Sequence, residues 1–452
     1  MDDHDAIAGQ IEALTRAALD RRLDRSAASP LVVAFSGGGD SLALLIGAFR
    51  WAEGAGRRLL AITVDHRLQA DSARWAEWCA DRALRLGVDH RTLAWDGEKP
   101  RTGLSAAARA VRHGLLAAAA REAGAKVILM GHTLDDRLEA RLMRAAGGSV
   151  LEPREWSPSP IWPAGRGLFL LRPLLSARRA TIRQRLTQAG ETWLDDPANA
   201  DPRHARVRAR LALADGGDLE LQIPEPVPTL DHVTITPAGE VIFGARASSP
   251  LWEKSGLEAR APIRALIAAA LLCASGSDRP PRRDRLDRLL ARLEAREPFI
   301  ATLAGARVEA YADRVLISRE AGDLARTRAA SRTLPCGAPL VWDGRFEIEA
   351  RVEGLSVAPL AGLARRLGRV ESAALRDLRP AVRKALPAIL DGEGRTSAPI
   401  LAPDPRVGIQ SLAAARFIAA CGGVQSEADI EVHGGNRSDT LNRGAKCYEA
   451  RK

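Results

Sequence analysis

The chain has 452 residues, of which 46% are hydrophobic and 27% are charged, and this composition excludes a disordered or collagen-like protein. Its 66 lysines and arginines outnumber 56 acidic residues, and the net charge of +10 favours a polyanionic partner, although GC-rich coding is an alternative source of the arginines. The five cysteines form no C-x-x-C pair, which argues against zinc ribbons, iron–sulfur clusters and disulfide frameworks. Without a signal peptide or an apolar run long enough to span a membrane, we expect a soluble cytoplasmic protein with no membrane partner.

Predicted strands and helices alternate along the first part of the chain. In order, we expect an amphipathic helix at 7–25, a buried strand at 31–35, a helix at 42–51, a strand at 59–64, a helix at 72–86, an alanine-rich helix at 104–123 and a strand at 126–130 that leads into a further helix. Strands separated by helices form right-handed βαβ units. The sequence therefore predicts an α/β fold with a doubly wound parallel sheet.

The rest of the chain has a less regular pattern. We expect an irregular surface loop at 152–175, a helix at 178–190, a glycine- and proline-rich linker at 216–228, a basic helical stretch at 260–297 and a hairpin at 302–317. Mixed short strands and helices follow. We therefore predict three domains, at 1–215, at 216–325 (mainly helical) and at 333–452 (small and α+β).

A glycine-rich loop follows the first predicted strand directly. Its residues are Ser36, Gly37, Gly38, Gly39, Asp40 and Ser41. Glycines allow close approach of the backbone to a ligand, and the N–H groups and the following helix N-terminus favour an anion. The loop lacks the Gly-Lys-Ser/Thr of a Walker A motif and the spacing of a dinucleotide fingerprint. We therefore predict a phosphate-binding loop rather than a plain glycine-rich turn.

The string Ser-Gly-Gly-x-Asp-Ser between a strand and a helix resembles the pyrophosphate loop (PP-loop) of the N-type ATP pyrophosphatases. The resemblance implies that 36–41 binds ATP, which is cleaved between its α and β phosphates. It makes Asp40 a candidate ligand of Mg²⁺, placed to neutralise the departing pyrophosphate. An acid favoured by the helix dipole is a plainer interpretation of Asp40, and the two are compatible.

A second group of polar residues follows the predicted strand at 126–130. His132, Asp136 and Glu139 are spaced i, i+4 and i+7, which places them along one helical face. One histidine and two carboxylates at the mouth of a sheet suit metal binding, orientation of an amine or proton transfer. The alternative is a solvated charged face with local pairs to Arg137 and Arg141.

This segment and a later one resemble the tRNA(Ile)-lysidine synthase family. The string from His132 to Glu139 is similar to that family's H-x-x-D-D-x-x-E-T segment, with Ala140 in place of threonine. Arg144 matches an arginine just downstream in the family, and Arg172 begins a string similar to its R-P-L-L element.

A third string is similar to the family's W-x-E-D-x-S-N-x-D…R-N-x-x-R signature. Here it occupies 193–201, with Arg206 and Arg210 beyond it. It departs from the signature at Asp195, Ala198 and Val207. The resemblance is strong over 30–215 and loose over 260–320.

The resemblance implies a two-step reaction with ATP, Mg²⁺, free L-lysine and tRNA(Ile) with a CAU anticodon. ATP would adenylate the wobble cytidine, and the ε-amine of lysine would then replace AMP at ring carbon 2. Mg²⁺ would lie near Asp40 and Asp136, and Glu139 or His132 would orient or deprotonate the lysine ammonium.

Arginines are the candidate ligands of phosphate and of the adenylated intermediate. We assign Arg206 to catalysis and expect Arg144, Arg172 and Arg210 to bind tRNA or the intermediate. The stretch 172–210 holds nine arginines against four acids, a predicted track for the anticodon stem, with a solvated basic face as the alternative. The second and third domains would bind tRNA, and a homodimer is compatible with the sequence.

Two other functions remain open at this point. A tRNA thiolase of the same superfamily would also adenylate a base, but such enzymes usually carry a cysteine pair, and only Cys79 lies in the first 215 residues. A catalytically inactive tRNA-binding module is the other alternative. The presence of Asp40, Asp136 and Glu139 argues against it.

Overall fold

The computed structural model describes residues 3–147, 150, 152–195, 205–214, 230, 232–244, 257–327 and 331–434. By its internal contacts the chain forms two compact units, Met1–Ile223 with Val424–Gly435 and Pro224–Gly423 with Asn436–Lys452. The boundary expected between 325 and 333 lies inside the second unit, and the division into three domains stays a prediction.

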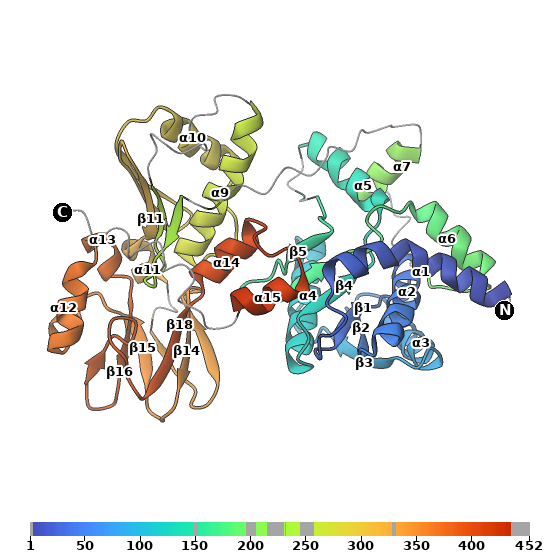
Figure 1. Cartoon of the computed structure of the whole chain (residues 1–452), viewed down its shortest axis with the longest axis horizontal. Helices are drawn as coiled ribbons and strands as arrows, with labels where there is room; N and C mark the ends of the chain where they lie inside the picture. Colours follow the sequence, from blue (N-terminus) through green and yellow to red (C-terminus); the bar gives the residue numbers. More distant parts are fainter. Residues whose placement is uncertain are drawn as a thin grey trace. The chain divides into compact units, whose positions relative to one another are not determined.

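The first unit contains the alternating strands and helices that the sequence predicts (Figure 1). Its elements are α1 (Asp3–Arg22), β1 (Leu31–Ala34), α2 (Gly39–Ala55), β2 (Leu59–Asp65), α3 (Ser72–Arg85), β3 (Asp89–Ala94), α4 (Leu104–Glu122), β4 (Val127–Met130), α5 (Leu134–Ala145), β5 (Trp156–Pro158), β6 (Phe169–Leu171), α6 (Arg179–Gln188), α7 (Ala205–Ala214) and α15 (Glu427–Gly434).

These strands form one six-stranded sheet in the order β3-β2-β1-β4-β6-β5. All neighbouring pairs are parallel except β5 with β6. The chain moves outward from β1 to β3 and then returns to β4 on the other side of β1. Because such crossovers are right-handed, α2 and α3 cover one face of the sheet and α4 covers the other. The doubly wound α/β prediction is confirmed.

The strands are apolar because helices cover both faces of the sheet. One core cluster joins β1, β2, β4 and β6 to the buried face of α4. Its members are Val32, Leu60, Ile62, Leu116, Ala117, Ala119, Ala120, Ala125, Ile128, Met130, Leu168 and Leu170. The small alanines of α4 let this helix lie close to the sheet.

Two parts of this sheet differ from the sequence prediction. The expected irregular loop at 152–175 contains β5 and β6, which are only three residues long and therefore give almost no periodic signal. Strand β3 was not predicted, because its residues Asp89–Ala94 are mostly polar, as a partly exposed edge strand allows.

Helix α15, close to the end of the chain, belongs to the first unit. The carboxylate of Glu427 binds both terminal nitrogens of Arg57, at 2.7 and 2.9 Å, and both side chains are only 2% exposed. The indole N–H of Trp156 donates to the Val424 carbonyl at 3.0 Å. A buried ion pair with additional hydrogen bonds thus attaches residues from the C-terminal part of the chain to the N-terminal unit.

The second unit contains a five-stranded sheet and two smaller sheets, all with antiparallel pairing between their strands. Its elements are β7 (Val233–Ile235), β8 (Val241–Phe243), α9 (Leu257–Ser275), α10 (Arg283–Glu294), β9 (Phe299–Leu303), β10 (Ala306–Ala310), β11 (Val315–Arg319), α11 (Ala321–Arg326), β12 (Arg332–Thr333), β13 (Pro339–Trp342), β14 (Phe346–Ala350), β15 (Ser356–Pro359), η2 (Ala364–Arg366), α12 (Arg369–Asp377), α13 (Pro380–Arg383), β16 (Pro387–Leu390), β17 (Thr396–Ser397), β18 (Val407–Ser411) and α14 (Ala413–Ala420).

The stretch predicted as mainly helical therefore also contributes a sheet, of order β7-β8-β11-β10-β9. The predicted hairpin at 302–317 is part of it.

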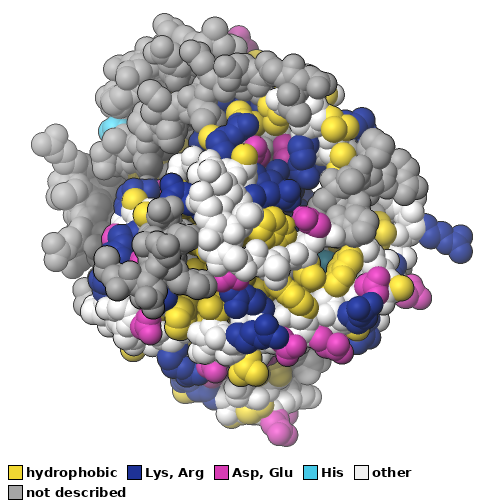
Figure 2. Space-filling model, turned by 90° about the vertical axis from the view of Figure 1, so that its right-hand side faces the viewer, with side chains coloured by type: hydrophobic (Ala, Val, Ile, Leu, Met, Phe, Trp, Pro, Cys, Tyr) yellow, Lys and Arg dark blue, Asp and Glu magenta, His cyan; other side chains and the backbone are white. Residues whose placement is uncertain are grey.

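Among the described residues, no helix is long and apolar enough to cross a membrane. Figure 2 shows basic and acidic side chains interspersed on the face in view, rather than one continuous basic surface.

Candidate active site

The loop after β1 has the strand–loop–helix form that the sequence predicts. Helix α2 begins at Gly39 with Gly38 as its N-cap, so the loop lies at the positive end of the helix. Gly37 has a φ of +81°, a conformation that favours glycine. The Ser41 hydroxyl donates to the Gly38 carbonyl at 2.8 Å and accepts from the Ser36 amide at 3.3 Å. This compact turn is suited to phosphate binding.

Two distant segments pack against this loop. A Cβ added to Gly131, directly after β4, would lie 3.1 Å from backbone atoms of Asp40 and Ser41. The backbone N–H of Leu194 donates to the Gly37 carbonyl at 3.0 Å. Three motifs thus meet at the carboxyl ends of β1 and β4, where the strand order reverses. Doubly wound sheets bind their ligands at this point.

The two predicted carboxylates lie on the first turns of α5, but His132 precedes that helix. Thr133 is the N-cap of α5, and its backbone N–H and hydroxyl both donate to Asp136 Oδ2, at 2.7 and 3.0 Å. The expected single helical stripe is therefore correct for Asp136 and Glu139 and wrong for His132. The connection after β4 still holds His132 close enough to Asp136 for the protonation of one to affect the pKa of the other.

Arg179, the first residue of α6, joins the carboxylates of both motifs. Its Nε donates to Asp40 Oδ2 at 2.9 Å, its Nη1 to Glu139 Oε1 at 3.1 Å, and its Nη2 lies 3.3 Å from Asp136 Oδ1. The planar guanidinium suits this arrangement, because its donors diverge in a fixed fork. One arginine thus links the phosphate loop to the acids of α5.

Glu139 is the most enclosed of these acids, with a side chain that is 0% exposed. Besides Arg179, it binds Arg206 Nε at 2.9 Å and Arg210 Nε at 2.9 Å, both from α7. Arg206 also lies 3.3 Å from Asp136. The alternative of a solvated face with local pairs does not hold, because the arginines at 137 and 141 bind Glu152 instead.

The charges in this group change one another's protonation. Burial raises the pKa of Asp40, against the opposing effect of Arg179. Burial would also raise the pKa of Asp136, but Arg206, His132 and Arg179 outweigh it and the pKa is lowered. The three carboxylates raise the pKa of Arg179 in spite of its burial. Asp136 and Arg179 are therefore ionised at neutral pH.

Arg172, just after β6, contacts the other side of His132. Its Nε donates to His132 Nδ1 at 3.2 Å, and its Nη1 donates to the Arg154 carbonyl at 2.6 Å and to Ser157 Oγ at 3.0 Å. Burial and then Arg172 lower the pKa of His132 well below its usual value. His132 is therefore neutral, and because Nδ1 accepts, its proton is assigned to Nε2.

Other predicted residues lie outside this group or outside the described part of the chain. Arg144 is exposed and donates to Glu152 at 2.7 Å, and Asp195 is exposed and pairs with Arg183 at 3.3 Å. Residues 196–201, the centre of the third motif, are not among the described residues. The roles assigned to these positions stay predictions.

Arg179 is the residue that the sequence analysis missed, because it treated 172–210 as a basic stretch for RNA. A signal was present. An arginine at the first position of a helix is opposed by the helix dipole, so it needs acidic partners from elsewhere. Carboxylates at the ends of neighbouring strands are the obvious candidates.

The cysteine of the first unit does not have the properties of a sulfur-transfer nucleophile. Cys79 is buried, and burial raises its pKa to about 11. A reactive cysteine needs a lowered pKa, because the thiolate is the nucleophile. The geometry therefore disfavours the thiolase alternative.

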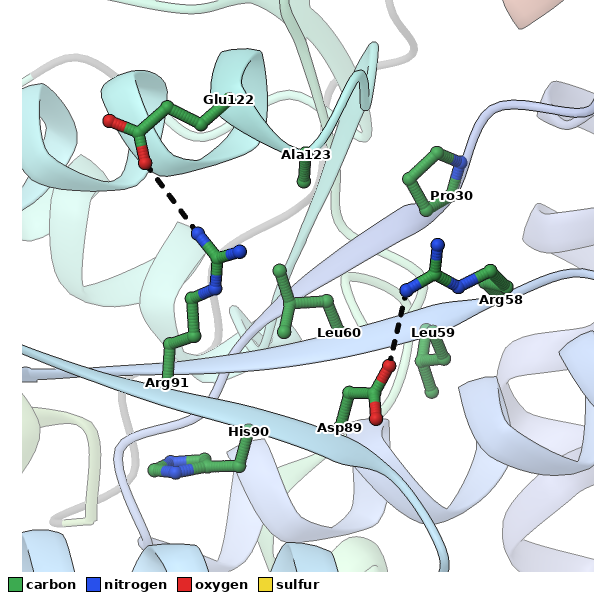
Figure 3. Close-up of a pocket in the computed structure, with 9 residues that line it drawn as sticks. All are labelled: Pro30, Arg58, Leu59, Leu60, Asp89, His90, Arg91, Glu122 and Ala123. Atoms are coloured by element: carbon green, nitrogen blue, oxygen red, sulfur yellow. Dashed lines mark hydrogen bonds and ion pairs between the residues drawn. The ribbon is translucent and has the colours of Figure 1, made fainter.

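The hollow drawn in Figure 3 lies at the opposite end of the strands, away from the phosphate loop. It is lined by residues at the amino ends of β2 and β3 and at the end of α4. Ion pairs join Arg58 to Asp89 at 3.4 Å and Arg91 to Glu122 at 3.5 Å. None of the predicted site residues lines this hollow.

Comparison with known proteins agrees with this geometry. The family model for the PP-loop domain matches residues 11–215. The tRNA(Ile)-lysidine synthase of Caulobacter vibrioides is 47% identical over 91% of this chain and 98% of its own length. The chain belongs to the tRNA(Ile)-lysidine synthase family. The matched PP-loop domain contains the loop, the α5 acids and the arginines that bind them, which places ATP use in the first unit.

Other members of the tRNA(Ile)-lysidine synthase family are also similar. The synthase of Hyphomonas neptunium is 35% identical over 73% of this chain and 94% of its own length, and that of Brucella ovis is 34% identical over 71% and 74%. The U34-tRNA thiolase of Methanococcus maripaludis matches 49% of this chain and 83% of its own, at 15% identity and a TM-score of 0.36, too distant to bear on function.

Proposed function

We propose that the chain uses ATP to ligate free L-lysine to ring carbon 2 of the wobble cytidine in the CAU anticodon of tRNA(Ile). The observation that carries this proposal is the meeting of the phosphate loop with the carboxylates of α5 at one end of the sheet. First, the oxygen on ring carbon 2 attacks the α-phosphorus and pyrophosphate leaves. Then the ε-amine attacks ring carbon 2, AMP departs with that oxygen, and the nitrogen releases its protons.

The loop at 36–41 is proposed to hold the β- and γ-phosphates of ATP. The N-terminus of α2 favours the negative charge that grows on the leaving pyrophosphate. Arg206 and Arg210 approach the same acids from α7, and their outer nitrogens suit the phosphate of the adenylated intermediate.

Magnesium fits the donors that are present. Asp40 Oδ1 is buried and has no hydrogen-bond partner among the described residues. The described part of the chain contains no cluster of three or more metal-binding side chains, and Mg²⁺ commonly uses only one or two carboxylates together with substrate phosphates. Asp40 and Asp136 would hold the ion, and its charge would offset that of the pyrophosphate.

The acids of α5 are proposed to receive the lysine ammonium. Asp136 and Glu139 offer the negative charge that a cation needs, although arginines already share it. His132 is less suited to act as the base, because its Nδ1 is occupied by Arg172 and its other nitrogen carries a proton. This favours Glu139 over His132 for orienting the amine.

The second unit is proposed to bind tRNA, and a homodimer remains a prediction from the sequence. In the first unit, Arg144 of α5 is exposed and is paired with Glu152. We propose that it contacts the RNA backbone.

The decisive experiment measures transfer of labelled lysine to tRNA by the purified chain with ATP and Mg²⁺. We expect label in the tRNA, with release of AMP and pyrophosphate, and background pyrophosphate release when tRNA is omitted. Asp40→Ala should reduce transfer by about a hundredfold or more, because it removes charge stabilisation at the reacting centre.

Asp89→Ala is the matched control, since Asp89 is an exposed acid at the opposite end of the strands of the same sheet (Figure 3). It should transfer lysine at the rate of the unaltered chain. Failure to transfer lysine, or transfer that is insensitive to Asp40→Ala, would contradict the proposal.

A further inference from the structure

Hydrogen bonds connect β3, an edge strand of the sheet, to the phosphate loop. His90 on β3 (Figure 3) has its Nε2 2.9 Å from the hydroxyl oxygen of Thr63 on β2. That hydroxyl donates to the carbonyl of Phe35 at 2.8 Å. Phe35 follows β1 and directly precedes the loop at 36–41. Neither Thr63 nor His90 is among the residues that the sequence analysis assigned to the site.

The direction of these bonds follows from the single proton of a hydroxyl. Because Thr63 gives its proton to the Phe35 carbonyl, its oxygen accepts from His90, and the ring proton is assigned to Nε2. Burial lowers the pKa of His90, so the ring is neutral at pH 7. Thr63 and Phe35 are both buried, so water is kept from this carbonyl and the hydroxyl supplies its donor.

The bond to Phe35 also orients the first amide of the loop. The carbonyl of Phe35 and the N–H of Ser36 belong to one planar trans peptide unit and point in opposite directions. That N–H donates to the Ser41 hydroxyl oxygen at 3.3 Å, and the Ser41 hydroxyl donates to the Gly38 carbonyl at 2.8 Å. One series of hydrogen bonds therefore runs from β3 to the N-cap of α2.

The direction of backbone N–H groups matters in a phosphate loop, because these groups bind the anion. Fixing the Gly38 carbonyl also fixes the N–H of Gly39, the first residue of α2. A glycine-rich backbone rotates easily, and ordering it when ATP binds reduces affinity. Bonds that hold the peptide units beforehand remove part of this cost, and each bond of a series strengthens its neighbours.

Thr63 lies against the loop itself. It is hydrogen-bonded to the thiol of Cys79 on α3, and a Cβ added to Gly37 would lie 2.9 Å from that sulfur. The loop thus packs directly on the interior that contains Thr63.

We propose that Thr63 and His90 are positioning residues for ATP, which hold the phosphate loop in the conformation that binds the β- and γ-phosphates. This rests on the role proposed for 36–41. Thr63 acts through the Phe35 peptide unit, and His90 acts through Thr63 by directing its hydroxyl toward that unit.

The first test removes the hydroxyl and keeps the shape of the side chain. In Thr63→Val, the KM for ATP in tRNA-dependent pyrophosphate release should rise about tenfold, because the Phe35 carbonyl loses its donor. The KM for lysine should hardly change. Thr63→Ser keeps the hydroxyl and should recover most of the affinity for ATP.

Thr15→Val is the matched control. Thr15 on α1 is also buried, and its hydroxyl donates to the Glu12 carbonyl at 3.0 Å, outside the series that leads to the loop. Its loss should reduce stability about as much as Thr63→Val and leave the KM for ATP unchanged. A purely structural role of Thr63 would lower the amount of active enzyme, and hence kcat, without this change in KM.

The second test concerns His90. His90→Phe should raise the KM for ATP about two- to threefold, and His90→Gln, which keeps an N–H donor, should have less effect. The double variant Thr63→Val with His90→Phe should match Thr63→Val alone, since His90 acts through the hydroxyl. His90 is only partly buried, so His90→Phe should fold even if Thr63→Val does not.

Direct binding separates this inference from the ligase activity. The dissociation constant of α,β-methylene-ATP with Mg²⁺, measured by calorimetry without tRNA or lysine, should rise in Thr63→Val by the same factor as the KM. An unchanged dissociation constant, an equal rise in Thr15→Val, or additive effects in the double variant would overturn the inference and leave the ligase activity standing. If the unaltered chain binds the analogue and does not transfer lysine, the proposed function fails while the role of Thr63 in ATP binding is still tested.

Discussion

Buried charge is balanced differently in two regions of the first unit. One is the group of acids around Arg179, and the other is the arginine cluster of Arg109, Arg112 and Arg172. Arg179 meets three carboxylates within 3.3 Å, so charge in that group is compensated inside the chain. The arginine cluster has no acid of its own among the described residues, and its pKa values are lowered by burial and mutual repulsion. A compensated group needs nothing further to be stable, whereas an uncompensated group gains most from a ligand.

The Arg57–Glu427 pair provides a structural reference for this comparison. It is as deeply buried as either group, it is compensated, and it lies away from the carboxyl ends of the strands. The uncompensated Arg172, by contrast, lies beside the site, because it binds His132. This difference in location supports a role for the uncompensated arginines in binding.

The largest effect on stability is expected from Glu427→Ala. It leaves Arg57 buried without its partner, and breaking a buried pair in this way destabilises by about 3–5 kcal/mol. Urea unfolding should report this loss. Glu53→Ala removes an exposed pair with Arg50 on α2 and should change the free energy of unfolding by less than about 1 kcal/mol. Equal effects of the two variants would contradict the integral role of α15 in the first unit.

Arg179→Ala should have the next largest effect, because it leaves three carboxylates facing one another. We expect a loss of about 3 kcal/mol in the free energy of unfolding and a fall of about a hundredfold or more in lysine transfer. Arg179→Lys should recover part of the stability, since it restores the charge but not the fork. A variant that is stable and fully active would show that the compensated group is not part of the site.

We expect His113, which is next to Arg112, to make the free energy of unfolding depend on pH by about 2 kcal/mol. Burial, followed by Arg112, lowers the pKa of His113 to about 3, so the folded chain keeps His113 neutral. Below the ordinary pKa of about 6.5, the unfolded chain binds a proton that the folded chain does not, and stability is lost as the pH falls. Between pH 7 and pH 5 this loss is about 2 kcal/mol.

His113→Phe should remove that part of the pH dependence, which unfolding at pH 7 and pH 5 would measure. Asp40 has the opposite effect on stability. Because burial raises its pKa, the folded chain binds a proton more readily than the unfolded chain, and Asp40 stabilises the folded chain as the pH falls. The two variants, His113→Phe and Asp40→Asn, should therefore change the slope of stability against pH with opposite signs. Slopes that match that of the unaltered chain would place His113 outside the buried charge of the cluster.

Much of this arrangement could be predicted from the sequence because it is local. An apolar strand followed by 36–41 fixes a phosphate loop within a few residues, and the i, i+3 spacing of Asp136 and Glu139 places both on α5. The partners of these acids are not local. Arg179 lies 40 residues beyond Glu139 and 139 beyond Asp40, and no periodicity connects them.

The same reason explains the other differences. The return of α15 to the first unit depends on a buried pair whose members are 370 residues apart. The strands β5 and β6 are short and β3 is polar, so each takes its place in the sheet from its neighbours rather than from its own residues. Sequence patterns report periodic burial well and long-range charge pairing poorly.

The smallest effect is expected from Arg210→Gln, and it tests how the compensated group shares its charge. Arg210 is more exposed than Arg179, and Glu139 keeps Arg179 and Arg206 when it is lost. A partly exposed pair contributes at most about 1 kcal/mol, so both stability and the rate of adenylation should fall only a few-fold. Arg206→Gln should be more harmful, because Arg206 also contacts Asp136. An unchanged rate of adenylation in Arg210→Gln would show that Arg210 does not help to bind the phosphate of the intermediate. A complete loss of adenylation at unchanged stability would show that Arg210 contributes more to that phosphate than to Glu139.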